Sequence, residues 1–392
     1  MKRPFLSGYV EGYYGRLPTF EERAGIVRKL REIGAGHYLY APKEDVYHRR
    51  EWRTPYPAAW RREFAAFVKA SRKQGVSVVP GIAPGLSYRY RDARDFETLS
   101  RKLISLTELG CDEAALLMDD ISTELPEADR DAYESLGEAH GLMLQLLWPR
   151  LRARGIRRLW FCPTVYSDFF APEGVENSVY LRDLAPFLEP GIELMWTGKA
   201  IVSPEYAPAG MRALGKRMGA PLVLWDNLYA NDYAPGRVFL GPFAGRPKAL
   251  LQAAGGMLLN PTGLHHTDLF HLDLLGGFLN GEPARAAWKR TLKAWEVPAE
   301  FEKVASLFET PLAAFDKTLK PAKAPNASEV KALREALKPL IWDWKSPLKR
   351  EWYPYLYAMD ADLRLLEKGK GAPDAAWVRK KFSVPVAARL LR

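Results

Sequence analysis

The sequence predicts an α/β protein, a (β/α)8 TIM barrel followed by a smaller C-terminal α-helical domain. Short apolar runs alternate with amphipathic helical stretches eight times over about 280 residues, which matches such a barrel in size and order. Helical patterns then continue without intervening strands. One apolar run ends in two adjacent aspartates, Asp119 and Asp120, at a strand exit, where parallel α/β proteins bind ligands.

The strand candidates are short apolar runs separated by helical patterns. The run Ala114–Met118 is continuously apolar, which is typical of a strand buried on both faces of a parallel sheet. An open doubly wound sheet is the structural alternative, but eight regular units favour closure. In chain order the candidates are Phe5–Val10, His37–Tyr40, Val76–Ile82, Ala114–Met118, Arg158–Cys162, Ile192–Trp196, Pro221–Trp225 and Gly256–Leu259.

The helical stretches between them carry apolar residues on one face, as Ile26, Leu30 and Ile33 do in the first. Thr19 followed by Glu22 predicts a capping box at the start of this helix. Glycines precede several strands, where a left-handed C-terminal cap favours this residue. They are Gly34, Gly75, Gly110, Gly155 and Gly219.

After Gly281 the pattern becomes wholly helical, with further helices predicted over residues 330–340, 353–368 and 375–382. We therefore predict a catalytic barrel over residues 1–282 and a helical domain over residues 283–392. The aromatic-rich C-terminal helices are candidates for pairing two chains into a homodimer.

The composition of 392 residues, with 47% hydrophobic residues and a net charge of +10, indicates a large packed core and a basic surface. No basic face interleaves with aromatics, so we expect no nucleic acid partner. No apolar segment has the length of a signal peptide or a membrane span, so we expect no membrane partner. Cys111 and Cys162 are expected to be reduced and buried, and the location to be cytoplasmic.

The predicted strand exits carry carboxylates, amides and aromatics, which suit a pocket for a polyhydroxylated ligand. These exits carry the seven segments Glu11-Gly-Tyr-Tyr-Gly-Arg16, Tyr40-Ala-Pro-Lys43, Met118-Asp-Asp-Ile121, Cys162-Pro-Thr164, Trp196-Thr-Gly198, Trp225-Asp-Asn227 and Asn231-Asp-Tyr233. Together these segments resemble glycoside hydrolase family 84, the β-N-acetylglucosaminidases that include protein O-GlcNAcases and bacterial relatives labelled hyaluronidases. The resemblance covers about residues 5–280 in order.

This resemblance implies retaining hydrolysis of terminal β-linked N-acetylglucosamine (GlcNAc), with no cofactor and no metal. The substrate would be a glycoside or glycoprotein bearing β-GlcNAc. In substrate-assisted glycosidases the 2-acetamido oxygen of the sugar attacks the anomeric carbon and forms an oxazoline, an exception to the usual carboxylate nucleophile. By the resemblance, Asp119 orients the acetamido group and Asp120 is the acid/base.

The resemblance also implies substrate-binding residues. Gly12 would offer its backbone to a sugar hydroxyl, and Lys43 would reach hydroxyls of the same sugar. Tyr166 would line the acetamido pocket, Trp225 would wall it, and Asn227 would bond to the acetamido group.

Asp232 is expected to bind the far hydroxyls that mark a terminal sugar, and Asn260 to bond nearby. The sequence departs from the family pattern at Tyr13, where many members carry Phe. It departs again at Gly15-Arg-Leu-Pro18, where Gly-Arg-Pro-Trp is common, and this concerns the shape of the loop.

Each assignment has a structural alternative. The aspartate pair could instead be structural or bind a metal, and Lys43 could form an ordinary ion pair. Tyr166 and Trp225 could be core aromatics, and Gly12 could be needed only for chain geometry. Asp232 and Asn227 could serve to form turns. The histidines of 265–271 lack the i,i+4 spacing of a helical metal site. For the whole chain, the alternative function is a catalytically inactive barrel that binds GlcNAc-containing glycans or glycoproteins. The natural aglycone is left open.

Overall fold

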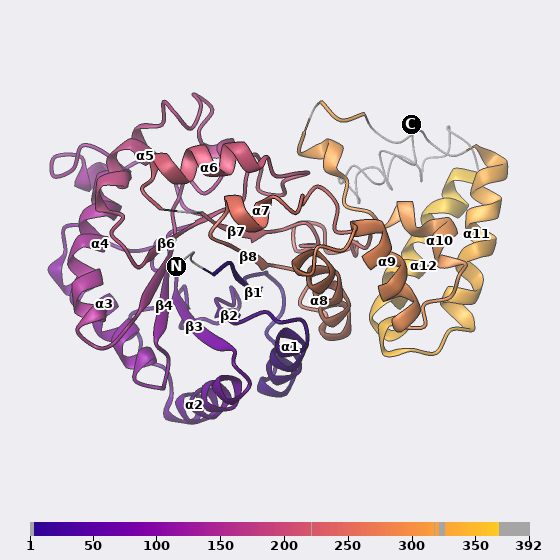
Figure 1. Ribbon diagram of the computed structural model, residues 1–392, viewed down its shortest axis with the longest axis horizontal. Coiled ribbons are helices and arrows are strands. Elements are labelled where there is room, and N and C mark those ends of the chain that lie inside the picture. The colour runs from indigo at the N-terminus through magenta and orange to yellow at the C-terminus, as the bar shows by residue number, and fades with distance from the viewer. Residues whose placement is uncertain (1–3, 221, 317, 321–325, 368–392) are drawn as a thin grey trace. The chain divides into compact units, whose positions relative to one another are not determined.

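The computed structural model describes residues 4–220, 222–316, 318–320 and 326–367. Its parallel strands close into a barrel in chain order, with β8 hydrogen-bonded to β1 (Figure 1). The predicted (β/α)8 barrel is therefore confirmed. Its strands are β1 (Leu6–Glu11), β2 (His37–Tyr40), β3 (Ser77–Ile82), β4 (Glu113–Leu117), β5 (Arg158–Cys162), β6 (Ile192–Trp196), β7 (Val223–Asp226) and β8 (Gly256–Leu259).

Helices surround the strands on the outside of the barrel, as Figure 1 shows for α1 to α6. The predicted capping box is present, since the Glu22 amide donates to Thr19 Oγ1 at 3.2 Å and the Thr19 amide donates to Glu22 Oε2 at 2.7 Å. All five glycines predicted at helix ends have positive φ. The helices are α1 (Phe20–Glu32), α2 (Ala58–Lys73), α3 (Ala93–Thr107), α4 (Leu136–Arg152), α5 (Val179–Leu184), α6 (Pro208–Arg217) and α7 (Leu250–Ala253).

Four strands have the predicted bounds and four are displaced by one or two residues. At β4 the displacement adds Glu113, a charged residue that hydropathy alone excludes from a buried strand. Its carboxylate is fully buried but accepts from Arg158 Nη1 at 2.5 Å and from Trp160 Nε1 at 2.6 Å. Buried charges are tolerated when they are paired in this way.

The barrel interior is filled by side chains from all eight strands and the loops that follow them, including Val10, Leu39, Leu117, Trp160 and Leu258. All of these are nearly inaccessible to solvent. Because the inward-facing residues fill the barrel, its axis is a packed core, and a ligand can be held only by the strand ends and loops.

Two fully buried histidines, His48 and His140, make the stability of the fold depend on pH. Burial lowers the pKa of both His48 and His140 to about 3, so each stays neutral in the folded protein. An unfolded chain takes up these protons below about pH 6.5, and stability therefore falls as the pH falls from 6.5 towards 3. At pH 5.0 each histidine should cost about 2 kcal/mol of the free energy of unfolding relative to pH 7.5.

Urea denaturation at the two pH values tests this, with His140→Gln as the comparison. His140 lies between the hydroxyls of Tyr90 and Tyr180, each at 2.7 Å, and glutamine keeps a donor and an acceptor there without titrating. The variant should lose about 2 kcal/mol less than the wild type on acidification. Equal losses would mean that His140 is protonated in the folded state.

The chain separates into two compact units. The first comprises residues 1–227 and 246–260 and contains all eight strands, and the second comprises residues 228–245 and 261–392. The units interleave along the chain, so the division predicted at residues 282 and 283 stays a prediction.

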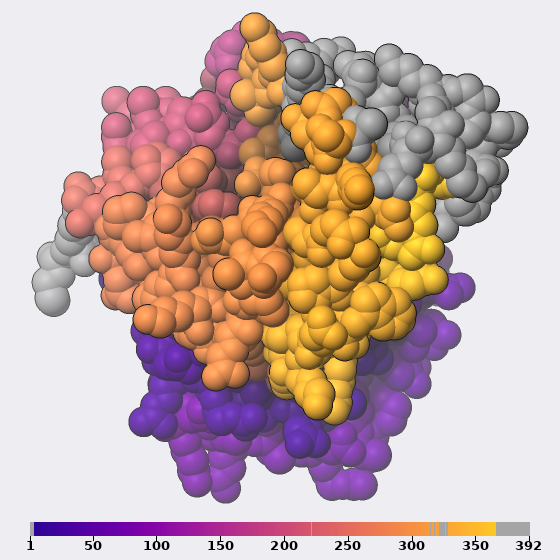
Figure 2. All heavy atoms as spheres, turned by 90° about the vertical axis from the view of Figure 1, so that its right-hand side faces the viewer, coloured from indigo at the N-terminus to yellow at the C-terminus, as the bar shows by residue number. Residues whose placement is uncertain are grey.

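The second unit is helical, as expected for the C-terminal region. Glu351 caps α8 by accepting from the amides of His266 and Thr267, at 2.9 and 2.8 Å, and Arg237 pairs with Asp362 at 2.8 Å. Figure 2 shows one face, where the orange residues of α9 and α10 adjoin the yellow residues of α11 and α12. The helices are α8 (His265–Leu279), α9 (Ala284–Ala294), α10 (Phe301–Val304), α11 (Ala327–Trp342) and α12 (Pro347–Glu367).

The helix predicted over residues 375–382 lies outside the described residues. Cys111 and Cys162 are both buried and unpaired, as expected from the sequence. In the part of the chain that the structure describes, no helix has the length and apolar content needed to cross a membrane.

Candidate active site

The carboxyl ends of the barrel strands bring together most of the predicted site residues. Since all eight strands are parallel, every exit lies at the same end of the barrel. All belong to the first unit; Trp225 lies within β7, and the others follow β1, β2, β4, β5, β7 and β8. They are Gly12, Lys43, Asp119, Asp120, Tyr166, Trp225, Asn227 and Asn260.

Asp119 is buried, and its two carboxylate oxygens differ. Oδ2 accepts from the Lys43 ammonium at 2.5 Å, whereas Oδ1 is buried and has no hydrogen-bond partner among the described residues. Burial alone would lower the pKa of Lys43, but the charges of Asp119 and Asp120 outweigh it and hold that pKa above its usual value. Lys43 is thus the counter-charge for the pair, and Asp119 Oδ1 is an acceptor without a donor.

Asp120 lies in a different environment from its neighbour. Its side chain is 33% exposed, and its φ of 55° puts the backbone in the left-handed region, which is uncommon outside glycine. Oδ2 accepts from the Tyr14 hydroxyl at 2.9 Å and Oδ1 from the Tyr166 hydroxyl at 3.1 Å. The left-handed turn therefore directs one carboxylate towards solvent while Asp119 stays buried.

The two tyrosines remain proton donors at neutral pH. Burial raises the pKa of Tyr14 to about 12 although the Lys43 charge opposes the change, and Asp120 adds to the increase. Burial, together with the charges of Asp120 and Asp119, also raises the pKa of Tyr166 well above its usual value. Both hydroxyls therefore present hydrogen to the Asp120 carboxylate.

On the other side of the site, an amide chain joins three strand exits. The Gly12 amide donates to Asn260 Oδ1 at 3.2 Å, and Asn260 Nδ2 donates to Asn227 Oδ1 at 2.9 Å. Asn227 Nδ2 in turn donates to the Ile201 carbonyl at 2.8 Å. The Gly12 amide, part of the backbone that was expected to be offered to a sugar, is therefore engaged within the protein.

A buried ion pair supports the Asn227 exit. The side chains of Arg246 and Asp226 are both fully buried, and the guanidinium contacts both carboxylate oxygens at 2.8 Å. The same guanidinium donates to the carbonyls of Ser203 and Pro204, at 3.0 and 2.9 Å. The pair fixes the end of β7 against the loop after β6.

Trp225 and Gly12 are in close contact. A methyl group built on Gly12 would lie 2.3 Å from Trp225 Cζ2, so only glycine fits beneath this indole. Trp225 itself is 5% exposed and belongs to the barrel core. The structure therefore explains Gly12 by its close approach to Trp225, and Trp225 by its place in the core, and neither role conflicts with a place in the site.

Asp232 belongs to the second unit, where its Oδ1 accepts from the Tyr233 amide at 2.9 Å. Its contact with far sugar hydroxyls stays a prediction, as do the ligand contacts assigned to the other site residues.

Two residues at the site were not predicted from the sequence. Tyr14 lies in the first exit segment, so its position among strand-end residues was the available signal. Arg49, which contacts Asp120, lies in a loop with no motif of its own, so only the folded chain reveals it.

In the 265–271 segment, His271 is buried in the packing of α8, with Nε2 3.1 Å from the Phe239 carbonyl. Across residues 4–220, 222–316, 318–320 and 326–367, no group of three or more His, Cys, Asp or Glu side chains is arranged to hold a metal ion.

A sequence model described as β-N-acetylglucosaminidase matches residues 7–308. The chain belongs to this family. The resemblance to glycoside hydrolase family 84 is thereby confirmed. The rat and mouse proteins named protein O-GlcNAcase are each 36% identical to it over 259 residues.

That match covers 66% of this chain but only 28% of each curated relative, so the chain spans a small part of their length. A solved structure of an O-GlcNAc hydrolase variant from Thermobaculum terrenum superposes with a TM-score of 0.81. The two chains are 23% identical, and the match covers 98% of this chain and 93% of that chain, which shows that they share a fold.

Proposed function

We propose that the chain is a retaining exo-β-N-acetylglucosaminidase that removes terminal β-linked GlcNAc by substrate-assisted catalysis. Family membership supports this activity, and one observation in the structure supports the mechanism. Asp119 Oδ1 is a buried carboxylate oxygen that lacks a donor among the described residues, next to an acid that is open to solvent. An acetamido N–H is a donor of the kind that this oxygen needs.

In the first step the acetamido oxygen attacks the anomeric carbon while its N–H donates to Asp119 Oδ1. The negative charge of Asp119 stabilises the positive charge that develops on the oxazoline nitrogen and carbon. Asp120 gives its proton to the glycosidic oxygen, the bond from that oxygen to the anomeric carbon breaks, and the aglycone leaves as an alcohol.

In the second step the Asp120 carboxylate takes a proton from water. The hydroxide equivalent bonds to the anomeric carbon, the bond from that carbon to the acetamido oxygen breaks, and the acetamido group is restored. Two inversions at the anomeric carbon give net retention. Tyr14 and Tyr166 hold the Asp120 carboxylate in position for both transfers.

The deciding experiment compares aryl β-N-acetylglucosaminides with the matching glucoside. Because an intramolecular nucleophile is worth several orders of magnitude, the glucoside should react at least about 1000-fold more slowly. Fluorination of the acetamido methyl should lower kcat/KM with each fluorine, since it weakens the attacking oxygen. Comparable turnover of the glucoside, or a sugar covalently attached to the protein, would contradict the mechanism. Binding without turnover would favour the inactive glycan-binding barrel.

Gly12→Ala tests the contact beneath Trp225. The added methyl group forces the indole away, which should cost about 1–3 kcal/mol of the free energy of unfolding and lower kcat/KM by about 100-fold. Urea denaturation and aryl-GlcNAc kinetics measure the two effects. Gly36→Ala is the matched control, because a methyl group there meets nothing within 4 Å. If both variants behave alike, Trp225 does not need its present position.

We also propose a cytoplasmic location, which the two buried unpaired cysteines support. A homodimer paired through α11 and α12 is the proposed assembly. Trp342 and Tyr357 on these helices are 63% and 44% exposed, an exposure that favours a covered surface. Analytical ultracentrifugation of the wild type and of Trp342→Lys tests the pairing, which should be lost in the variant.

A further inference from the structure

Arg49 is a buried cation in the loop between β2 and α2, and it is directed at Asp120. The residue is 7% exposed, and its Nη2 donates to the backbone carbonyl of Asp120 at 3.3 Å. This carbonyl belongs to the left-handed residue with φ of 55°. Such a conformation costs about 1–3 kcal/mol and persists only where the surroundings enforce it.

The other terminal nitrogen of Arg49 is unsatisfied. Nη1 is buried without a hydrogen-bond partner among the residues described, and it lies 3.9 Å from Asp120 Oδ2. Lys43, the other cation at the pair, is already bonded to Asp119 and lies 3.7 Å from the same oxygen. Arg49 Nη1 is therefore a charged donor beside Asp120 that no other described residue uses.

The loop that carries Arg49 is fixed to the end of β3. His48, which is neutral, donates from Nδ1 to the Gly81 carbonyl at 2.8 Å, and its own carbonyl accepts from the Ala83 amide at 2.9 Å. The Arg49 side chain also lies over the Tyr14 ring, with the guanidinium carbon 5.9 Å from the ring centre. These contacts leave the guanidinium little freedom to move away from Asp120.

We propose that Arg49 is a positioning residue for the acid/base carboxylate. One nitrogen holds the backbone of Asp120 in its left-handed turn. The other stabilises the carboxylate that forms when Asp120 gives its proton to the leaving oxygen, because a charged donor beside it strengthens as that charge develops. The inference rests on the proposed function and extends it to a residue that need not touch the sugar.

The test measures kcat/KM over a series of GlcNAc glycosides whose leaving groups range from dinitrophenol to an alkyl alcohol. Poor leaving groups need the proton most. Arg49→Met should therefore lose about 100-fold or more on the alkyl glycoside but less than about 10-fold on the dinitrophenyl glycoside. Arg49→Lys keeps the buried charge without the forked geometry and should recover part of the loss. If the methionine variant folds poorly, the lysine variant is compared with the wild type instead.

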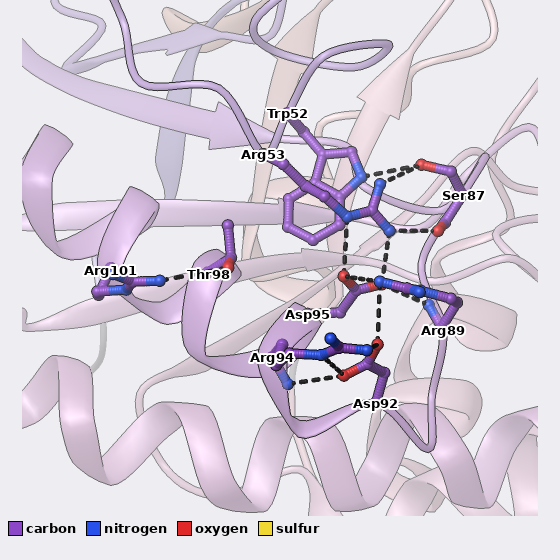
Figure 3. Close-up of polar contacts among 9 residues, drawn as sticks. All are labelled: Trp52, Arg53, Ser87, Arg89, Asp92, Arg94, Asp95, Thr98 and Arg101. Atoms are coloured by element: carbon purple, nitrogen blue, oxygen red, sulfur yellow. Dashed lines mark hydrogen bonds and ion pairs between the residues drawn. The ribbon is translucent and has the colours of Figure 1, made fainter.

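Arg53→Met is the matched control from the same loop. Its guanidinium donates to Asp95, at 2.8 and 2.5 Å, and to Ser87, at 2.9 Å (Figure 3). Losing these contacts should lower the urea midpoint and leave the dependence on leaving group unchanged. If Arg49→Met likewise loses the same factor on every substrate, Arg49 is structural and the inference fails alone. If the wild type hydrolyses none of the substrates, the proposed function fails with it.

Discussion

Asp120→Asn should abolish most hydrolysis of GlcNAc glycosides with poor leaving groups while sparing the first step on activated ones. General acid/base catalysis contributes about 10²–10⁴-fold, so we expect kcat/KM to fall about 1000-fold on an alkyl glycoside. A dinitrophenolate leaves without protonation, and its loss in kcat/KM should be about 10-fold or less. Steady-state kinetics across such a series measures the difference.

Asparagine is the better replacement at this position for a conformational reason. The φ of Asp120 is 55°, a region that asparagine tolerates better than alanine, so Asp120→Ala would add backbone strain to the loss of the acid. Asp131→Asn, an exposed carboxylate before α4, is the matched control and should retain wild-type kinetics. Equal losses on all leaving groups for Asp120→Asn would remove it from the role of acid.

Asp119→Asn should slow every substrate by a similar factor and also destabilise the fold. The variant cannot offset the positive charge of the oxazoline, and loss of one preorganised interaction of this kind costs about 10²–10³-fold in kcat. It also leaves the Lys43 ammonium buried with one carboxylate fewer, and breaking a buried pair costs about 3–5 kcal/mol. Kinetics and urea denaturation on the same preparation measure both effects.

The double variant Lys43→Met with Asp119→Asn separates the two effects. Removing the unpaired ammonium should restore much of the stability lost in Asp119→Asn, because no buried charge is then left without its partner. Activity should remain low in the double variant. Recovery of activity along with stability would mean that Asp119 serves only to compensate Lys43.

The pattern of apolar and polar residues along the chain predicted most of the architecture. The strands from Arg158 and Ile192 have the predicted bounds because each is mostly apolar, with one charged residue apiece, Arg158 and Glu193. The strand β4 extends to Glu113, because the guanidinium of Arg158 and the indole of Trp160 make burial of its charge possible. Neither partner is recognisable as such in the sequence, since both lie 45 or more residues away.

For the candidate site too, the sequence predicted where residues lie but not which side chains they pair with. Strand exits predicted that Asp119, Lys43 and Asn227 would lie at one end of the barrel, since parallel strands all end there. They did not predict that the Asn227 amide is bonded to Asn260, or that Lys43 is the counter-charge of Asp119. Such pairings depend on distances of a few ångströms between side chains from different strands.

By itself, the sequence determined the closed barrel, the helical C-terminal region, the family and the placement of two adjacent aspartates at a strand exit, because hydrophobic periodicity and strand-end motifs are local properties of the chain. Only the tertiary structure decided that one acid is buried against Lys43 while its neighbour turns to solvent through a left-handed residue. It alone brought Arg49 to that turn. Burial, charge compensation and backbone conformation arise from contacts between distant segments, and these exist only once the chain has folded.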